Sequence, residues 1–230
     1  MKTIQALACA AMLALGGSAS AANHLYSFNG TMADALGGAD MVGLGGTLGA
    51  SSYSFGKNEG LALAEALGSV YTIDMVMSFD SHSGWQKIID FKDRTSDMGL
   101  YTSNTQWYFY NIGSMGNVPA DGQSARVTLT RDSGSLVSLY VNGALAGSFT
   151  DSGNIATFSG AKANFFVDDL TNAKPEAGAG NVDYIATFDR ALTAAEVANG
   201  VSPVPEPATG AMLAAGLGML ALLRRRSGKA

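Results

Sequence analysis

The sequence predicts an all-β protein, an antiparallel β-sandwich that ends in a short helix. Several short apolar or alternating segments follow one another, Gly, Asn, Asp and Ser residues separate them, and helix-capping signals occur in a single place. Residues 22–207 are numerous enough to bury one sizeable core. The single cysteine, Cys9, lies in a segment that we expect to be removed, so this core must stabilise the fold without a disulfide.

The clearest strand signal covers residues 70–79. Apolar side chains at 71, 73, 75, 77 and 79 alternate with polar ones at 72, 74 and 78, a pattern typical of a half-buried antiparallel strand. Similar runs predict further strands at residues 85–91, 106–110, 126–130, 136–141, 164–167 and 182–188.

Turn and cap residues fix three further elements. Asn142-Gly143 between 136–141 and 144–149 predicts a type I′ hairpin, because both residues accept positive φ. Thr193 and Glu196 have the spacing of a capping box, and Gly200 can end the short helix that follows. The glycine-rich stretch 37–49 predicts turns or a mobile loop rather than a strand.

The first 22 residues have the organisation of a signal peptide. Lys2 precedes an apolar run over 4–15, and Ala19-Ser20-Ala21 fits signal peptidase, so we expect cleavage after Ala21 or Ala22. The apolar run of about 12 residues is shorter than the roughly 20 that a membrane-spanning helix needs. The sandwich domain is therefore expected over residues 23–200.

The C-terminal end has three parts: a Pro-rich linker over 201–207, an uncharged stretch over 208–223 and a basic tail over 224–230. A helix over 208–223 would be about 24 Å long, slightly short of the roughly 30 Å apolar core of a bilayer. Arginine side chains can snorkel to the interface, and a basic flank marks the cytoplasmic side. We expect transient anchoring in the inner membrane, with the domain outside.

These parts resemble the PEP-CTERM sorting signal of Gram-negative bacteria. The residues that carry the resemblance are Pro205, Glu206 and Pro207, the apolar stretch, and Arg224, Arg225 and Arg226. The resemblance implies handling by an exosortase after signal peptidase, an association with exopolysaccharide and biofilm, and a final place at the cell surface or in the extracellular matrix.

The domain resembles a laminin-G-like, concanavalin A-like jelly roll. The motifs are Leu25-Tyr26-Ser27-Phe28 and the segments 127–132, 139–143 and 182–196. The resemblance spans about residues 25–199. It implies a protein that binds glycans, proteins or calcium, since only some members are enzymes.

The net charge of the domain limits the classes of ligand that it can bind. Residues 22–207 hold nine Lys and Arg and all nineteen Asp and Glu, a net charge of −10. Such a domain repels phosphate backbones, which argues against nucleic acid, and favours divalent cations or neutral glycans.

Few residues have the pattern of a catalytic site. A glycosidase needs two carboxylates at about 5–9 Å across a groove, and no two Glu residues alternate on one predicted strand. Asp168 and Asp169 are adjacent, so in a regular strand they would point to opposite faces. His24 and His82 belong to no zinc or triad motif. We therefore expect a binding protein rather than an enzyme.

An oxygen-rich run is the candidate metal site. Asp168, Asp169, Asn172 and Glu176 leave a predicted strand and enter a glycine-containing loop, and calcium prefers such oxygen ligands, so we expect a structural calcium ion there. The alternative is a solvated turn with an Asx cap. Asp151 cannot be placed relative to this run. A second candidate is Asp183 with Asn29 and Asp34, because the first and last strands of a sandwich often adjoin.

Aromatic residues offer a candidate glycan site. Trp85, Trp107, Tyr108 and Tyr110 can stack on sugar rings, or can pack in the core. Alternation places Trp107 with Phe109 on one face of the strand and Tyr108 with Tyr110 on the other, so at most one pair is exposed. The favoured function is binding of an extracellular polysaccharide. The alternatives are a structural or adhesive matrix protein without a small ligand and, less favoured, a glycan hydrolase.

Overall fold

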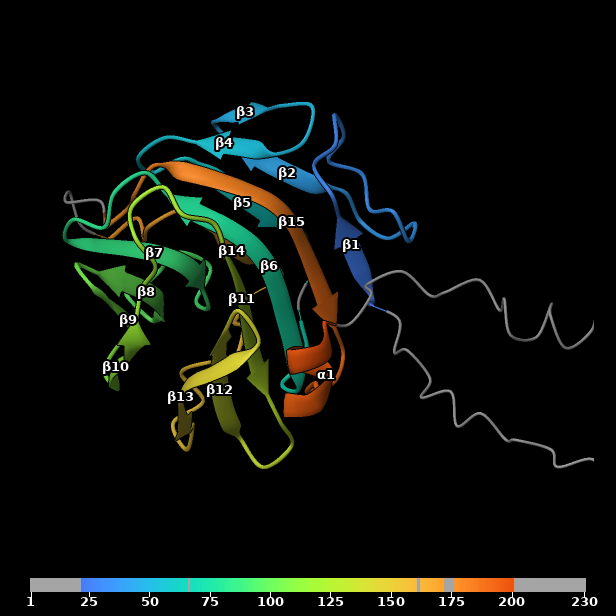
Figure 1. The fold of residues 1–230 in the computed structure, drawn as a ribbon. Helices are drawn as coiled ribbons and strands as arrows, with labels where there is room; N and C mark the ends of the chain where they lie inside the picture. The colour runs from blue at the N-terminus through green and yellow to red at the C-terminus, as the bar shows by residue number, and fades with distance from the viewer. Residues whose placement is uncertain (1–21, 66, 161, 172–175, 201–230) are drawn as a thin grey trace, which may run out of the picture.

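The computed structural model describes residues 22–65, 67–160, 162–171 and 176–200. They form two antiparallel sheets packed face to face and one helix, α1 (Ala194–Asn199), as Figure 1 shows. The predicted sandwich with a short C-terminal helix is thereby confirmed. The expected signal peptide, Asn172, the linker and the helix over 208–223 lie outside the described residues. Within the described ranges, no helix is both long and apolar enough to cross a membrane.

The larger sheet has eight strands. Its order runs β13-β12-β11-β6-β15-β4-β3, and β1 also pairs with β15. The bounds are β13 (Ala144–Thr150), β12 (Leu136–Val141), β11 (Ala125–Arg131), β6 (Tyr71–Phe79), β15 (Gly180–Phe188), β4 (Tyr53–Phe55), β3 (Thr47–Leu48) and β1 (His24–Tyr26).

The smaller sheet has seven strands and carries the candidate site. Its order and bounds are β10 (Gly113–Asn117), β9 (Gln106–Phe109), β8 (Gly99–Ser103), β7 (Trp85–Asp90), β14 (Ala163–Phe165), β5 (Gly60–Leu63) and β2 (Met41–Leu44).

The inner faces of the two sheets share one apolar core. Ile73 and Met75 of β6 lie in it with Leu100 of β8 and Phe165 of β14, all four with no exposed surface. Burying one such side chain stabilises the fold by about 1.5–3 kcal/mol, so these contacts hold the sheets together without a disulfide.

The prediction of a half-buried β6 is wrong, because its outer face is covered too. Asp74 on that face is 2% exposed. Its carboxylate accepts hydrogen bonds from Arg126 Nε at 2.9 Å, Thr128 Oγ1 at 2.5 Å and Tyr184 Oη at 2.7 Å. A polar side chain at an alternating position therefore marks a buried hydrogen-bond network here rather than a solvated face.

The glycine-rich stretch 37–49 corrects a second prediction, because it contains β2 and β3. Gly45 and Gly46, with φ of 89° and 77°, form the turn between these strands. Both strands lie at sheet edges and pair through backbone hydrogen bonds with β5 and β4. Such backbone pairing needs few apolar side chains. The hydrophobic pattern of the sequence therefore did not indicate these two strands.

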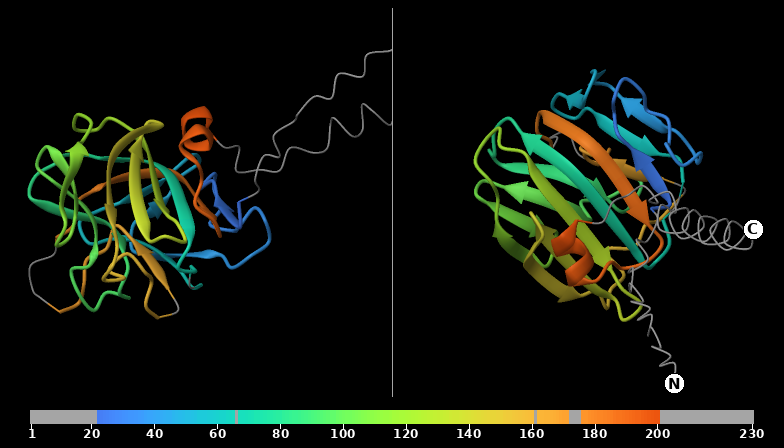
Figure 2. Two further views of the ribbon diagram at one scale, coloured as in Figure 1. Left: turned by 90° about the horizontal axis from the view of Figure 1, so that it is seen from below. Right: turned by 45° about the vertical axis from the view of Figure 1, so that its right-hand side comes forward.

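The predicted turn and caps are confirmed. Asn142 and Gly143 have φ of 51° and 83° between β12 and β13. Thr193 and Glu196 form the capping box of α1, and Gly200 follows its end. Ala22 packs with Val197 of α1 in one small apolar cluster, so both ends of the described domain leave from the side of β1 and α1 (Figure 2).

Candidate functional site

The outer face of the seven-stranded sheet carries aromatic side chains on β7, β8 and β9. Tyr101 pairs with Lys87 on one side and with Tyr108 on the other. Since side chains alternate along a strand, Leu100 and Phe109 point to the core while Tyr101 and Tyr108 point outward.

The alternation predicted for this region is confirmed, and it removes one predicted ligand residue. Trp107 is 1% exposed and lies in the apolar core with Phe109. Its ring is therefore not available to stack on a sugar. Tyr108 and Tyr110 stay partly exposed.

An aromatic row forms on the outer face, made of Trp85, Tyr101, Tyr108 and Tyr110. The ring centroids of Trp85 and Tyr108 are 5.0 Å apart, those of Trp85 and Tyr101 5.7 Å, and those of Tyr101 and Tyr110 6.2 Å. Tyr101 is buried beneath the others, whereas Trp85 is 40% exposed. Trp85 and Tyr108 thus offer adjacent ring surfaces to solvent, and Tyr110 is joined to them through the buried Tyr101 ring.

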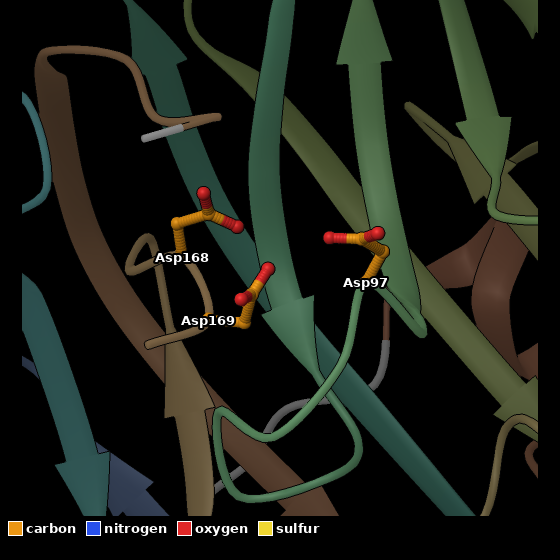
Figure 3. A group of neighbouring side chains, drawn as sticks. All are labelled: Asp97, Asp168 and Asp169. Carbon is orange, nitrogen blue, oxygen red and sulfur yellow. The ribbon is translucent and has the colours of Figure 1, made fainter. Parts of the chain in front are cut away.

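An acidic cluster lies beside this row, made of Asp97, Asp168 and Asp169. Each offers a carboxylate oxygen within 4.8 Å of the other two, and Figure 3 shows the three side chains pointing toward one another. Asp97 comes from the connection between β7 and β8, and the other two follow β14. Sequence reasoning missed Asp97, because no local motif links it to residues so far along the chain.

The adjacent Asp168 and Asp169 reach the same cluster because β14 has already ended. Phe166, directly after the strand, has a φ of 66°, which breaks the regular alternation. The Asp168 N–H then donates to Asn58 Oδ1 at 3.1 Å, and Asp169 Oδ1 accepts from the Thr171 N–H at 2.7 Å. The prediction that the two carboxylates face opposite ways is therefore wrong.

The Lys87 ammonium is the cation at the centre of these acids. Its side chain has no exposed surface, and Nζ lies 3.2 Å from Asp168 Oδ1, 3.4 Å from Asp90 Oδ2 and 4.0 Å from Asp169 Oδ2. Nζ also lies 5.2 Å from the centroid of the Tyr101 ring. One lysine thus faces several carboxylates, and the site keeps an excess of negative charge.

Neighbouring acids shift one another's pKa. The hydrogen bond with Asp169, burial and the Asp169 charge all raise the pKa of Asp97. The pKa of Asp169 is lowered to about 2. Burial acts to raise it, but hydrogen bonds from Thr171 and Asp97 and the charge of Lys87 outweigh the effect of burial. Each carboxyl thus acts on the pKa of the other, and a bound cation would relieve the repulsion between them.

Glu176 adds a fourth acid to the edge of the cluster. Its backbone N–H donates to Asp168 Oδ2 at 2.6 Å, and burial with the charges of Asp97 and Asp168 raises its pKa. Among the described residues, the buried oxygens Asp97 Oδ1, Glu176 Oε2 and Tyr101 Oη have no hydrogen-bond partner. A calcium ion binds six to eight oxygen atoms at distances of about 2.3–2.6 Å. Carboxylates with unsatisfied oxygens therefore fit such an ion.

The remaining predicted acids are engaged in local structure. Asp151 pairs with Arg131 Nε at 3.0 Å and accepts the amides of Ile155 and Ala156, so it caps a turn away from the cluster.

β1 and β15 adjoin as predicted, but the second calcium candidate gains no support from this pairing. Asp34 is occupied by His24 and by backbone amides. Among the described residues, the metal-type grouping includes neither Asp34 nor Asp183.

The fold and this face define a lectin-like β-sandwich with an aromatic and acidic surface. The family model of the concanavalin A-like lectin/glucanases superfamily matches residues 55–198, and the chain belongs to that superfamily. The PEP-CTERM protein-sorting motif matches residues 203–227. The protein is therefore exported to the cell envelope or surface, with processing by an exosortase.

Solved structures share the fold at low identity. Domain 4 of AbnA, an extracellular arabinanase from Geobacillus stearothermophilus in complex with arabinotriose, is 19% identical with a TM-score of 0.61, over 79% of this chain and 98% of that one. Trypanosoma rangeli sialidase is 14% identical with a TM-score of 0.57, over 76% of this chain and 31% of the sialidase chain. The botulinum neurotoxin type G receptor binding domain is 16% identical with a TM-score of 0.53, over 78% and 50%. No curated protein sequence matches the chain.

Proposed function

We propose that this chain is an exported module that binds an extracellular polysaccharide through the aromatic row. The observation that carries the proposal is the pair of adjacent, partly exposed rings of Trp85 and Tyr108, with the partly exposed Tyr110 on the other side of the buried Tyr101 ring. The apolar faces of pyranose and furanose rings stack on such surfaces, and nearby polar groups orient their hydroxyls. The arabinotriose held by the similar arabinanase domain supports a saccharide ligand for this fold.

The acidic cluster is proposed as a calcium site next to the row. Asp97, Asp168, Asp169 and Glu176 supply hard oxygen ligands, and a divalent cation offsets the charge that Lys87 leaves uncompensated. Asp97 also has a hydrogen bond with Tyr110, so an ion held by Asp97 would fix the position of a ring in the row. Calcium is thus expected to stabilise the domain and to order the glycan-binding surface.

Binding is favoured over hydrolysis by the geometry of the acids. A glycosidase holds its two carboxyl groups on either side of the scissile bond, about 5 Å or more apart. Here Asp97, Asp168 and Asp169 have carboxylate oxygens within 4.8 Å of one another, closer than that separation. Mutual contact of this kind is suited to sharing a cation.

A polysaccharide pull-down on the mature protein tests the proposal. The parent is expected to sediment with polysaccharide from its own matrix, and Trp85→Ala and Tyr108→Ala are expected to release it. The matched control is Leu145→Ala on β13, which removes a more exposed apolar side chain (59%, against 40% for Trp85) from the other sheet and should bind like the parent.

Three outcomes separate the candidate functions. Loss of binding in both aromatic variants supports the glycan-binding face. A parent that sediments with no polymer from its matrix overturns it in favour of a structural or adhesive protein without a small ligand. Release of new reducing ends by the parent overturns it in favour of a hydrolase.

A further inference from the structure

Lys87 is the one fully buried lysine among the residues that the structure describes. Its side chain has no exposed surface, and the facing Asp168 side chain is 1% exposed. The other described lysines, Lys57, Lys92 and Lys162, keep contact with solvent. An amine is a nucleophile, and a carboxyl group beside it in a site without water is an electrophile that it can attack. The pair therefore has the composition of the two reactants of an amide bond.

The contact between these two groups is close, but it is not a hydrogen bond. Lys87 Nζ lies 3.2 Å from Asp168 Oδ1. Among the described residues, this Oδ1 is nevertheless a buried oxygen without a hydrogen-bond partner. In a well-aligned salt bridge the ammonium donates a hydrogen bond to the carboxylate oxygen, so the alignment of the two groups here is a different one. A separation of about 3–3.5 Å between reacting groups is typical of a near-attack arrangement.

The groups around the pair are placed to assist a condensation. The Glu176 N–H donates to Asp168 Oδ2 at 2.6 Å, which orients the carboxyl group and stabilises negative charge that develops on Oδ2 during attack. Asp90 Oδ2 accepts a hydrogen bond from Lys87 Nζ at 3.4 Å, and the Asp90 side chain has no exposed surface. The Tyr101 ring covers the amine, with its centroid 5.2 Å from Nζ. The amine is thus held in place beside a second carboxylate that can accept a proton.

We propose that Lys87 and Asp168 join in an intramolecular amide bond. Lys87 Nζ passes one proton to Asp168 Oδ1 and attacks Cγ, so that an Nζ–Cγ bond forms and the Cγ–Oδ1 bond breaks. Asp90 accepts the second proton from the nitrogen and returns it to Oδ1, which leaves as water. One ammonium and one carboxylate thus give one amide and one water molecule, and nothing is oxidised or reduced.

Burial favours the amide over the ion pair. Each charge in a dry site carries a desolvation penalty, and neutral replacements for a buried ion pair are often at least as stable as the pair. The amide removes one positive and one negative charge together, so the net charge of the acidic cluster does not change. Asp168 keeps Oδ2 as the amide oxygen, which can still face a calcium ion, because calcium also accepts neutral carbonyl oxygens.

The bond would reinforce a short strand pairing. β14 has three residues and pairs with β7 at only two positions, whereas β8 pairs with β7 at five. A covalent link from Lys87 on β7 to Asp168 just after β14 holds these strands together when their hydrogen bonds open. The domain has no cysteine outside its predicted signal peptide, so a disulfide cannot supply such a link.

The intact mass of the mature protein, purified in chelator and then denatured, tests the proposal. The parent is expected to be about 18 Da lighter than its sequence, the mass of one water molecule. Proteolytic digestion is expected to give a linked pair of peptides that contains both Lys87 and Asp168. The experiment needs neither calcium nor a glycan, so a negative result leaves the proposed function unaffected.

Three variants assign the bond to these two residues. Lys87→Arg keeps the positive charge but has no reactive amine, so it is expected at its full sequence mass. Asp168→Asn can still condense with Lys87 but releases ammonia instead of water, so its loss is expected to change to about 17 Da. Lys57→Arg is the matched control on an exposed lysine, and it should show the same loss as the parent.

A link present in the parent and in Lys57→Arg, and absent from Lys87→Arg, supports the proposal. A parent at its full sequence mass overturns it and leaves Lys87 and Asp168 as an ion pair. Linked peptides that join other residues, or a loss of water that persists in Lys87→Arg, also overturn it. Should Lys87→Arg fail to fold, the linked peptides of the parent and the loss of ammonia from Asp168→Asn decide the question.

Discussion

The Lys87 ammonium lies 3.2 Å from the Asp168 carboxylate, and neither side chain has more than 1% of its surface exposed. Lys87 is also within ion-pair distance of Asp90 and Asp169. A buried charge that loses its partner retains its desolvation penalty, so this lysine should matter more for stability than any exposed ion pair of the domain.

We expect Lys87→Met to lower the free energy of unfolding by about 3–5 kcal/mol in chelator, because several carboxylates then share a dry site without a cation. Calcium should recover part of this loss, and more than it adds to the parent. Denaturant titrations with and without calcium measure both effects. The exposed Lys57→Met is the control, expected within about 0.5 kcal/mol of the parent. Equal losses in the two variants would contradict the role of Lys87.

Calcium at 100 times its dissociation constant should add about 2.7 kcal/mol to the stability of the parent. Asp97→Asn and Asp169→Asn remove ligand charge and should abolish that gain. Asp80→Asn, an exposed acid outside the cluster, should retain it. Thermal unfolding in calcium and in chelator provides the measurement, and identical melting temperatures for the parent in both would remove calcium from the site.

Two tryptophans should separate folding from binding. Trp107→Ala empties a core position and should cost about 3–5 kcal/mol of stability. Trp85→Ala should leave stability nearly unchanged but weaken polysaccharide binding about tenfold, since one aromatic contact is worth about 0.5–1.5 kcal/mol. Melting curves and affinity electrophoresis on both variants test this, and a destabilised Trp85→Ala that binds normally would reverse the assignment.

Lowering the pH should destabilise α1, because Glu196 then becomes protonated. The hydrogen bond with Arg190 lowers the pKa of Glu196 from 4.5 to about 2. Because the folded-state pKa is the lower one, the stabilisation is present above pH 4.5 and is lost as the pH falls toward about 2. Glu196→Gln should remove this part of the pH dependence and about 1 kcal/mol of stability at neutral pH. Unfolding curves of parent and variant between these pH values that stay parallel would show that Glu196 does not titrate as described.

We expect processing to change both ends of the chain. We expect the secreted chain to begin at residue 22 or 23, and the segment beyond Pro207 to be removed or held in the membrane. Intact-mass analysis of surface and membrane fractions decides both points. Recovery of a chain that still begins at Met1 from the cytoplasm would contradict export.

Sequence patterns predicted long core strands such as β6 and β15 and the hairpin at Asn142, because alternation and turn chemistry are local. They missed β5 and β8, short strands that also fill the core, and the edge strands β2 and β3, which are built on backbone pairing rather than side-chain burial. They also treated the polar face of β6 as solvated, although Arg126 and Tyr184 cover Asp74.

The candidate site was only partly predictable for a related reason. Asp168, Asp169 and Glu176 form one local run, and the aromatic residues follow strand alternation. Asp97 and Lys87 join them only through the pairing of β7 with β14 and β8. Register between distant strands is a tertiary property, and no spacing in a single sequence reveals it.

The two ends of the domain leave beside β1 and α1, whereas β7, β8 and β9 lie at the far side (Figure 1). Under the proposed function, a domain held at the membrane by its tail would present the aromatic row away from that membrane. A polymer pulling on the row would then load β6 and β15, two nine-residue strands joined in one antiparallel ladder. Their hydrogen bonds are then loaded together in shear rather than one at a time, which is the direction in which a β-sheet resists mechanical drag best.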